Sequence, residues 1–69
     1  MIEVFKTNVH EDEQAERLIK ALSDYFPNSR ITFDLEDCDR ILWVAGDDVC
    51  PKKTIALLSL NGFECEALI

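Results

Sequence analysis

The chain holds few of the residues from which most enzyme active sites are built. It has one histidine, His10, and two glycines, Gly46 and Gly62, and each glycine stands where a turn is expected. No phosphate-cradling loop, GxSxG motif or histidine-containing triad can be assembled from this inventory. We therefore expect a protein that is not an enzyme and that holds no cofactor.

Cysteine is present, but its spacing matches neither a metal-binding pair nor a complete set of disulfides. Cys38, Cys50 and Cys65 are an odd number at wide spacing, and no CxxC pair occurs. This excludes a complete internal disulfide framework. Because a free cysteine usually packs as a small apolar side chain, we expect reduced, structural thiols, with Cys65 in the core.

Positive charge and long apolar runs are also scarce. Seven lysines and arginines stand against 14 aspartates and glutamates, so the net charge is −7, which opposes binding to nucleic-acid phosphates or anionic lipids. The longest apolar runs are a few residues, too short to span a membrane. The first residues, MIEVFKTN, lack a signal-peptide pattern. We expect a cytoplasmic protein that binds neither nucleic acid nor membrane.

What the chain does contain is a regular alternation of strand-like and helix-like segments. With 69 residues and 48% hydrophobic content, residues 1–69 are expected to form a single domain. Short β-branched or alternating segments predict strands at residues 2–6, 30–36, 40–45 and 64–69. Pro51 fits the first position of a second helix with Cys50 at its cap, and the pair at 61–62 (Asn-Gly) ends it.

The first helix has a start signal and a buried stripe. Asn8 and Glu11 form a capping-box pattern, and the acidic residues that follow suit the positive end of the helix dipole. Pro27 ends the segment. Apolar side chains recur at helical spacing and predict one buried face, made by Ala15, Leu18, Ile19, Leu22, Tyr25 and Phe26.

Two strands differ in polarity. Residues 30–36 alternate strictly, which indicates a strand with one wet face near a sheet edge. Residues 40–45 are continuously apolar, which is typical of a central strand covered on both sides. Trp43 is then expected in the core; on an uncovered sheet face it would instead be a binding anchor. Carboxylates should be prominent on that uncovered face: Asp34 and Glu36 by phase, with Glu3 and Glu66 as further candidates.

The order β-α-β-β-α-β fixes the fold class. Right-handed crossovers put both helices on one face of the sheet. The sequence therefore predicts an α+β, ferredoxin-like sandwich with a four-stranded antiparallel sheet in the order 4-1-3-2.

Several segments also resemble a known family. Leu18 and Leu22 match its apolar helical pair, residues 31–35 and 42–44 match its second and third strands, and residues 57–63 match its glycine-aromatic turn. The chain is thus similar to the heavy-metal-associated (HMA) domain family of small copper chaperones and metal-pump modules. This resemblance covers nearly the whole chain and implies the same ferredoxin-like framework.

The chemical motif of that family is missing. The family has a GMTCxxC loop before the first helix, and counting back puts Asn8, Val9 and His10 at its glycine, methionine and threonine. Glu11 and Gln14 then stand at the two cysteines. Soft ions such as Cu(I) need thiolates, so the chain resembles a divergent member without the thiolate site.

The leading functional hypothesis is a non-catalytic protein-interaction module. Its open sheet face, or the edge of its second strand, would bind a protein partner or a second copy of the chain. The competing interpretation of that charged face is a solvated surface with no partner.

The alternative hypothesis is a heavy-metal binding or transport protein with divergent ligands. One candidate is the acidic turn of His10, Glu11 and Glu13, since imidazole and carboxylates hold Zn(II) or Ni(II) weakly. The other is the pair Cys38 and Cys50, if folding brings them together. The acidic turn also has a sufficient structural reason in the helix dipole, so no metal is the default expectation.

Overall fold

Six elements follow one another in the predicted order β-α-β-β-α-β within residues 1–68, the part of the chain that this computed structural model describes. They are β1 (Ile2–Thr7), α1 (Asp12–Tyr25), β2 (Arg30–Asp34), β3 (Ile41–Ala45), α2 (Pro51–Leu60) and β4 (Cys65–Ala67). The strands form one antiparallel sheet in the order β2-β3-β1-β4. The predicted fold class and strand order are confirmed; the last position of the predicted fourth strand, Ile69, lies outside the described residues.

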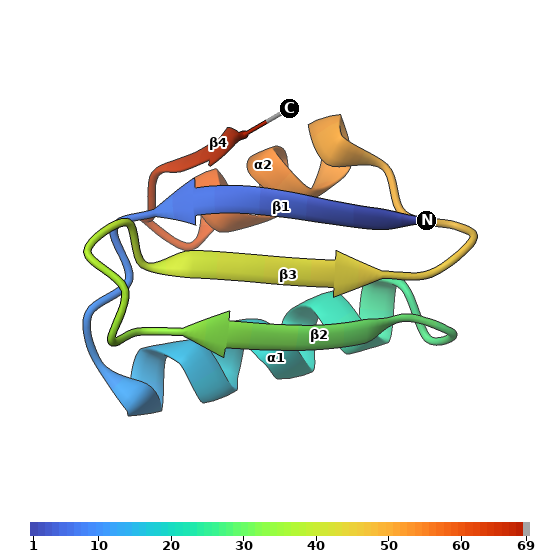
Figure 1. Cartoon of the computed structure of the whole chain (residues 1–69). Coiled ribbons are helices and arrows are strands. Elements are labelled where there is room, and N and C mark those ends of the chain that lie inside the picture. The colour runs from blue at the N-terminus through green and yellow to red at the C-terminus, as the bar shows by residue number, and fades with distance from the viewer. Residues whose placement is uncertain (69) are drawn as a thin grey trace.

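Both helices lie on one face of the sheet, behind it in the view of Figure 1. Within residues 1–68 no element covers the other face, which is called the open face below. The β2–β3 hairpin and the β3–α2 connection are at opposite ends of the sheet (Figure 1). These two ends matter for the candidate metal ligands.

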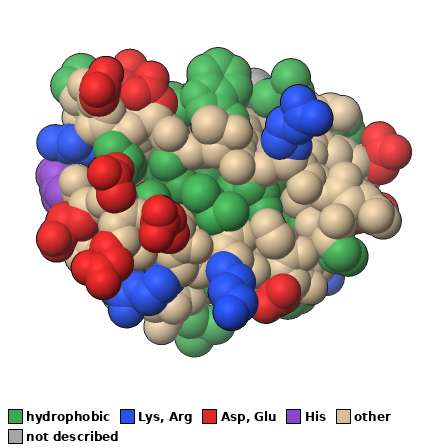
Figure 2. All heavy atoms as spheres, turned by 90° about the horizontal axis from the view of Figure 1, so that it is seen from below, with side chains coloured by type: hydrophobic (Ala, Val, Ile, Leu, Met, Phe, Trp, Pro, Cys, Tyr) green, Lys and Arg blue, Asp and Glu red, His purple; other side chains and the backbone are tan. Residues whose placement is uncertain are grey.

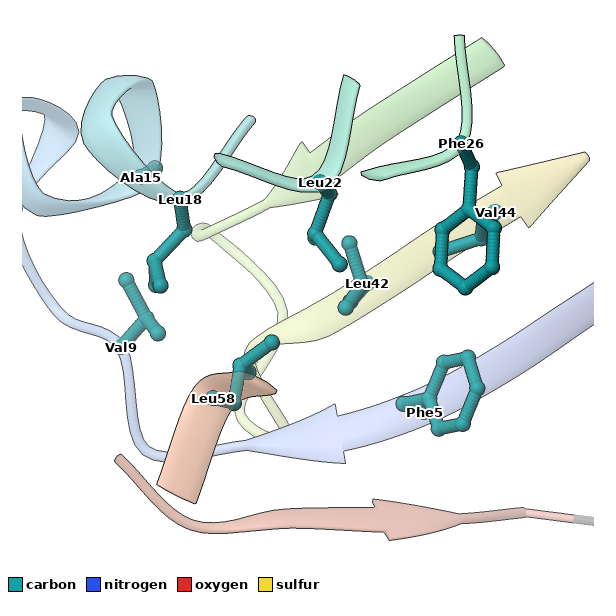
Figure 3. Packing of buried hydrophobic residues seen from close by; sticks show 9 residues of the cluster. All are labelled: Phe5, Val9, Ala15, Leu18, Leu22, Phe26, Leu42, Val44 and Leu58. Carbon is teal, nitrogen blue, oxygen red and sulfur yellow. The ribbon is translucent and has the colours of Figure 1, made fainter. Parts of the chain in front are cut away.

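The core fills the space between the sheet and the helices. Phe5 of β1 and Leu42 of β3 lie opposite each other in the register and are fully buried. Figure 3 shows them among side chains from α1 and α2; the full cluster is Phe5, Val9, Ala15, Leu18, Leu22, Phe26, Leu42, Val44 and Leu58. A fully buried leucine or phenylalanine contributes about 1.5–3 kcal/mol of transfer free energy.

Helix α1 ends before Pro27, as predicted, but it differs from its predicted form in its N-cap and in the burial of Tyr25. Its N-cap is Glu11, not Asn8, and the Glu11 side chain makes no capping hydrogen bond. Tyr25 was expected in the buried stripe but is 51% exposed, with its ring edge-on to Phe26. The Lys53 Nζ atom lies 5.6 Å from the centre of the Tyr25 ring, so this aromatic joins the two helices at the surface.

Helix α2 begins and ends as predicted. Cys50 is its N-cap and Pro51 its first residue. At the other end Gly62 adopts φ 86°, and the N–H groups of Gly62 and Phe63 donate to the carbonyls of Ser59 and Leu58. This is a Schellman arrangement, which needs a left-handed residue after the helix and therefore favours glycine.

Strand β3 is not covered on both sides, contrary to the prediction. Leu42 and Val44 face the helices and are fully buried, whereas Trp43 points to the open face and is 45% exposed. The strand then ends at Gly46, where an added Cβ would lie 3.0 Å from the Cβ of Ser29. Glycine thus lets the end of β3 approach the start of β2 closely.

The polar groups of the interior are paired. Among residues 1–68, every buried side-chain nitrogen or oxygen has a hydrogen-bond partner. Buried Thr54 donates its hydroxyl to the Cys50 carbonyl at 3.0 Å, for example.

Neither described helix is long and apolar enough to cross a membrane.

Candidate functional site

The segment before α1 has a structural role. Val9 is fully buried, and its N–H donates to the Thr7 hydroxyl. The Asn8 side chain accepts a hydrogen bond from the Glu64 backbone at 2.8 Å and donates to the Glu64 carboxylate at 3.4 Å. Asn8 therefore holds the approach to β4 rather than capping α1.

The proposed acidic-turn ligands are all at the surface. His10, Glu11 and Glu13 are exposed. In the described part of the chain, the one group of three or more metal-ligating side chains within 4.8 Å is Asp37, Cys38 and Asp39. None of the three acidic-turn residues belongs to that group.

The second candidate pair is separated. Cys38 is exposed in the β2–β3 hairpin, while Cys50 is half-buried at the start of α2, and these two segments are at opposite ends of the sheet (Figure 1). Folding therefore does not bring Cys38 and Cys50 together in one site.

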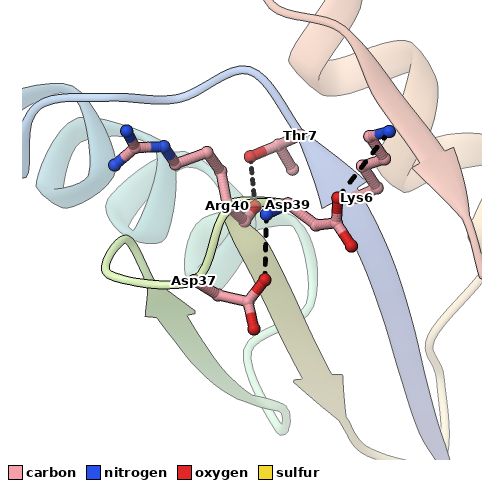
Figure 4. Close-up of polar contacts among 5 residues, drawn as sticks. All are labelled: Lys6, Thr7, Asp37, Asp39 and Arg40. Carbon is pink, nitrogen blue, oxygen red and sulfur yellow. Dashed lines mark hydrogen bonds and ion pairs between the residues drawn. The ribbon is translucent and has the colours of Figure 1, made fainter.

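The Asp37–Asp39 group is part of a tight hairpin loop (Figure 4). An Asp37 carboxylate oxygen accepts the Asp39 N–H at 2.8 Å, and Asp39 pairs with the Lys6 ammonium at 3.7 Å. Arg40 adopts φ 48°, unusual for a residue with a side chain, and its carbonyl accepts the Thr7 hydroxyl at 2.5 Å. The carboxylates thus have partners that explain their positions without an ion.

The surroundings of Cys65 change the pKa of its thiol. It is half-buried at the start of β4 and packs against the core. Burial raises the pKa of the Cys65 thiol from 9.0 to about 12. A thiol that resists ionisation is a poor nucleophile and a poor metal ligand. Cys65 was expected in the core, and it packs beside the core cluster instead, partly buried.

An apolar strip crosses the middle of the open face. Trp43 lies between Thr32 of β2 and Val4 of β1 in the sheet register. Leu68 continues the row beyond β4, because its N–H donates to the Val4 carbonyl. Ile2 adds apolar surface at the end of β1, so the exposed Trp43 ring has apolar neighbours.

Charged side chains border this strip. The next row of the register holds Asp34, Ile41, Lys6 and Glu66. Asp34 and Glu66 thus lie on the open face as expected, whereas Glu3 shares the phase of buried Phe5 and belongs to the helix side. An apolar centre with a polar rim is the usual anatomy of a protein-binding surface.

The outer edge of β2 is the second exposed feature. Figure 2, seen from the β2 side, shows an apolar band along the middle of the molecule with acidic groups gathered at one end. A groove between β2 and α1 forms this band, and its apolar lining is Ala15, Ile19, Ile31, Phe33 and Leu35. The acidic residues Asp12, Glu16, Asp34 and Glu36 also line it.

Sequence reasoning located the β2 edge but not the full groove. The alternation from Arg30 onward signals a strand with one wet face, whereas Ile19 was expected to be buried and is half-exposed. Helical spacing shows that Ile19 is on the inner side of α1, but not that the sheet stops short of covering it.

The fold and its exposed surfaces define a small α+β protein of ferredoxin-like layout. Comparison with models of protein families, with curated proteins and with solved structures found no match. The resemblance to the HMA family therefore stays a prediction from the sequence.

Proposed function

We propose that this protein is a non-catalytic interaction domain that binds a protein partner through its open sheet face. The observation that carries the proposal is Trp43, a large aromatic side chain that is 45% exposed in the middle of the sheet. Tryptophan is enriched among residues that dominate binding energy, because it buries a large area and adds a polar N–H.

The partner that fits offers an apolar patch with neutral or basic surroundings. The strip of Trp43, Val4 and Leu68 needs apolar cover, while the net charge of −7 favours approach of a basic protein and opposes an acidic one. In this proposal the ferredoxin-like fold is a rigid scaffold for the binding surface. The chain resembles the HMA family but lacks the two cysteines of that family's metal-binding loop.

The test compares W43S with a matched control, L60S. Leu60 is 85% exposed on α2, so both variants exchange an exposed apolar side chain for serine. We expect partners captured from lysate of the native host by the wild type and by L60S to be lost with W43S. Loss of a central anchor costs about 2 kcal/mol or more, roughly thirtyfold in affinity.

The same residue supplies a direct readout. Trp43 is the single tryptophan of the chain, so its fluorescence reports on the open face alone. Titration of a captured partner should shift the emission to shorter wavelength as the indole leaves water. Identical sets of captured proteins for the wild type, W43S and L60S, with no emission shift, would contradict the proposal.

A further inference from the structure

The outer edge of β2 carries backbone hydrogen-bonding groups that face solvent. Gly46 donates its N–H to the Met1 carbonyl, so β3 residues 42 and 44 direct their backbone groups toward β1, and residues 41, 43 and 45 toward β2. Their β2 partners are Arg30, Thr32 and Asp34. The alternation leaves the N–H and C=O groups of Ile31 and Phe33 pointing outward.

We propose that a second copy of this chain pairs with this edge, β2 against β2 in antiparallel orientation, with a two-fold axis at Thr32. In this register Ile31 of one copy lies opposite Phe33 of the other. These are the residues whose backbone groups face outward, so the two strands can exchange four backbone hydrogen bonds. The proposal uses a different surface from the Trp43 strip, so each can fail alone.

In this register the side chains of β2 in one copy are complementary to those of β2 in the second copy. Arg30 lies opposite Asp34 of the second copy, twice by symmetry, on the open-face side. Ile31 and Phe33 form two pairs on the helix side, and Thr32 meets its own copy. Opposite charges, aromatic with β-branched residues, and threonine with threonine are the cross-strand pairs that stabilise antiparallel sheets.

The distribution of charge along the groove selects the same arrangement. Asp12, Glu16 and Glu36 line the groove where Leu35 follows β2. Antiparallel pairing carries this acidic end toward the Asn28–Arg30 end of the second copy. Parallel pairing would bring the two acidic ends together and oppose Arg30 with Arg30, which is unfavourable.

Pairing also covers apolar surface that is exposed in one copy. Ile31 and Phe33 are half-buried in the groove beside Ile19, and the two-fold axis sets the two α1 helices on the same side of the joined sheet. The product is a continuous eight-stranded sheet in which the β2 edge of both copies is paired.

The test uses charge reversal at the two ends of β2. R30D would place an aspartate opposite Asp34 of the second copy. D34R would place an arginine opposite Arg30 of the second copy. Each variant therefore brings two like charges together. We expect each to weaken self-association by about tenfold or more, measured by sedimentation from micromolar to millimolar protein at physiological salt. An equimolar mixture of R30D and D34R should form a mixed dimer, and the double variant R30D/D34R should regain the wild-type dimer.

Two controls keep the outcome specific. K52D makes the same charge change as R30D at an exposed position on α2 and should self-associate like the wild type. D34R lowers the net negative charge, so general repulsion alone predicts stronger association where the β2 register predicts weaker. Circular dichroism checks that each variant is folded.

Three results would overturn the β2 dimer. They are a wild-type chain that stays monomeric at millimolar concentration, a D34R variant that associates at least as strongly as the wild type, or a mixture without rescue. A register centred on Phe33 would oppose Arg30 with Glu36, beyond the end of β2, and would also fail the mixing test. None of these results alters the expected loss of partner capture by W43S, so the two proposals are tested separately.

Discussion

Cys65 makes the alkaline stability of the protein sensitive to a single thiol. Burial raises the pKa of this thiol to about 12 from 9.0, so the folded state keeps its proton at pH values where the unfolded state has lost it. The contribution is fully present below pH 9 and is lost as the pH rises from about 9 toward 12. We expect C65A to lose less stability than the wild type between mildly and strongly alkaline pH, measured by urea unfolding.

The size of this effect is bounded. One ionisation changes the free energy of unfolding by at most about 1.4 kcal/mol per pH unit, and the partial exposure of Cys65 lowers this further. C38A is the matched control, because Cys38 is exposed. Parallel pH dependences of the wild type, C38A and C65A would show that the Cys65 thiol is not protected by burial.

The exposure of Trp43 could not be predicted from the residue pattern alone. The apolar run from Ile41 to Ala45 predicts a central strand, and β3 is central in the sheet. The run does not say whether a second layer covers the strand. Both helices lie on one side, so the odd-numbered residues of this strand meet solvent or neighbouring side chains of the sheet, and Trp43 is the most exposed large one.

At the scale of elements, the start of α1 offers a direct stability test. Glu11 is the N-cap, with extended backbone angles (φ −113°, ψ 141°) and no side-chain capping bond. Serine at an N-cap accepts a bond from the free N–H groups of the first turn, and alanine cannot. We expect E11S to be more stable than E11A by about 1 kcal/mol, measured by chemical denaturation.

The pair is matched because both variants remove the same negative charge from the same position. Equal stabilities of E11S and E11A would mean that the helix starts elsewhere, for example with Asn8 as its cap. In that case N8A, and not E11A, would lower the helix content.

Local signals predicted the elements better than their boundaries. Pro51 and Gly62 mark α2 correctly, because fixed φ at a helix start and positive φ after its end are properties of single residues. The start of α1 depends on distant partners: Asn8 bonds Glu64, 56 residues away, and Val9 enters the core. Such contacts follow from the tertiary structure and leave no periodic trace in the sequence.

For the whole molecule, uncompensated charge should limit stability. The chain carries a net charge of −7, and within residues 1–68 the only ion pair is Lys6 with Asp39. Exposed pairs of this kind contribute about 1 kcal/mol at most. Added sodium chloride screens the repulsion among carboxylates, so we expect the melting temperature to rise with salt, by about 4–8 °C for each kcal/mol gained.

The control for this salt effect is acidity. At about pH 4 many ordinary carboxyl groups are protonated, and the dependence of the melting temperature on salt should shrink. A melting temperature that is independent of salt at neutral pH would mean that the acidic side chains are spaced too widely to repel each other.

The overall architecture could be predicted because every level of the sequence agreed on it. Element order, the polarity of the strand beginning at Arg30 and the apolar third strand together indicate the observed strand order. The candidate sites could not be settled in this way. Whether Cys38 and Cys50 meet depends on which end of the sheet each connection occupies, and their separation appears only in the folded chain.

The uncovered face has a consequence for the strength of binding. In the β2-paired dimer both Trp43 strips would face the same way, aligned through the two Thr32 residues at three strand spacings, about 14 Å apart. A partner with two matching segments could then engage both strips, the second at a high effective concentration. Avidity would let a domain of this size hold its partner tightly with two weak contacts, and dilution of the dimer would release it.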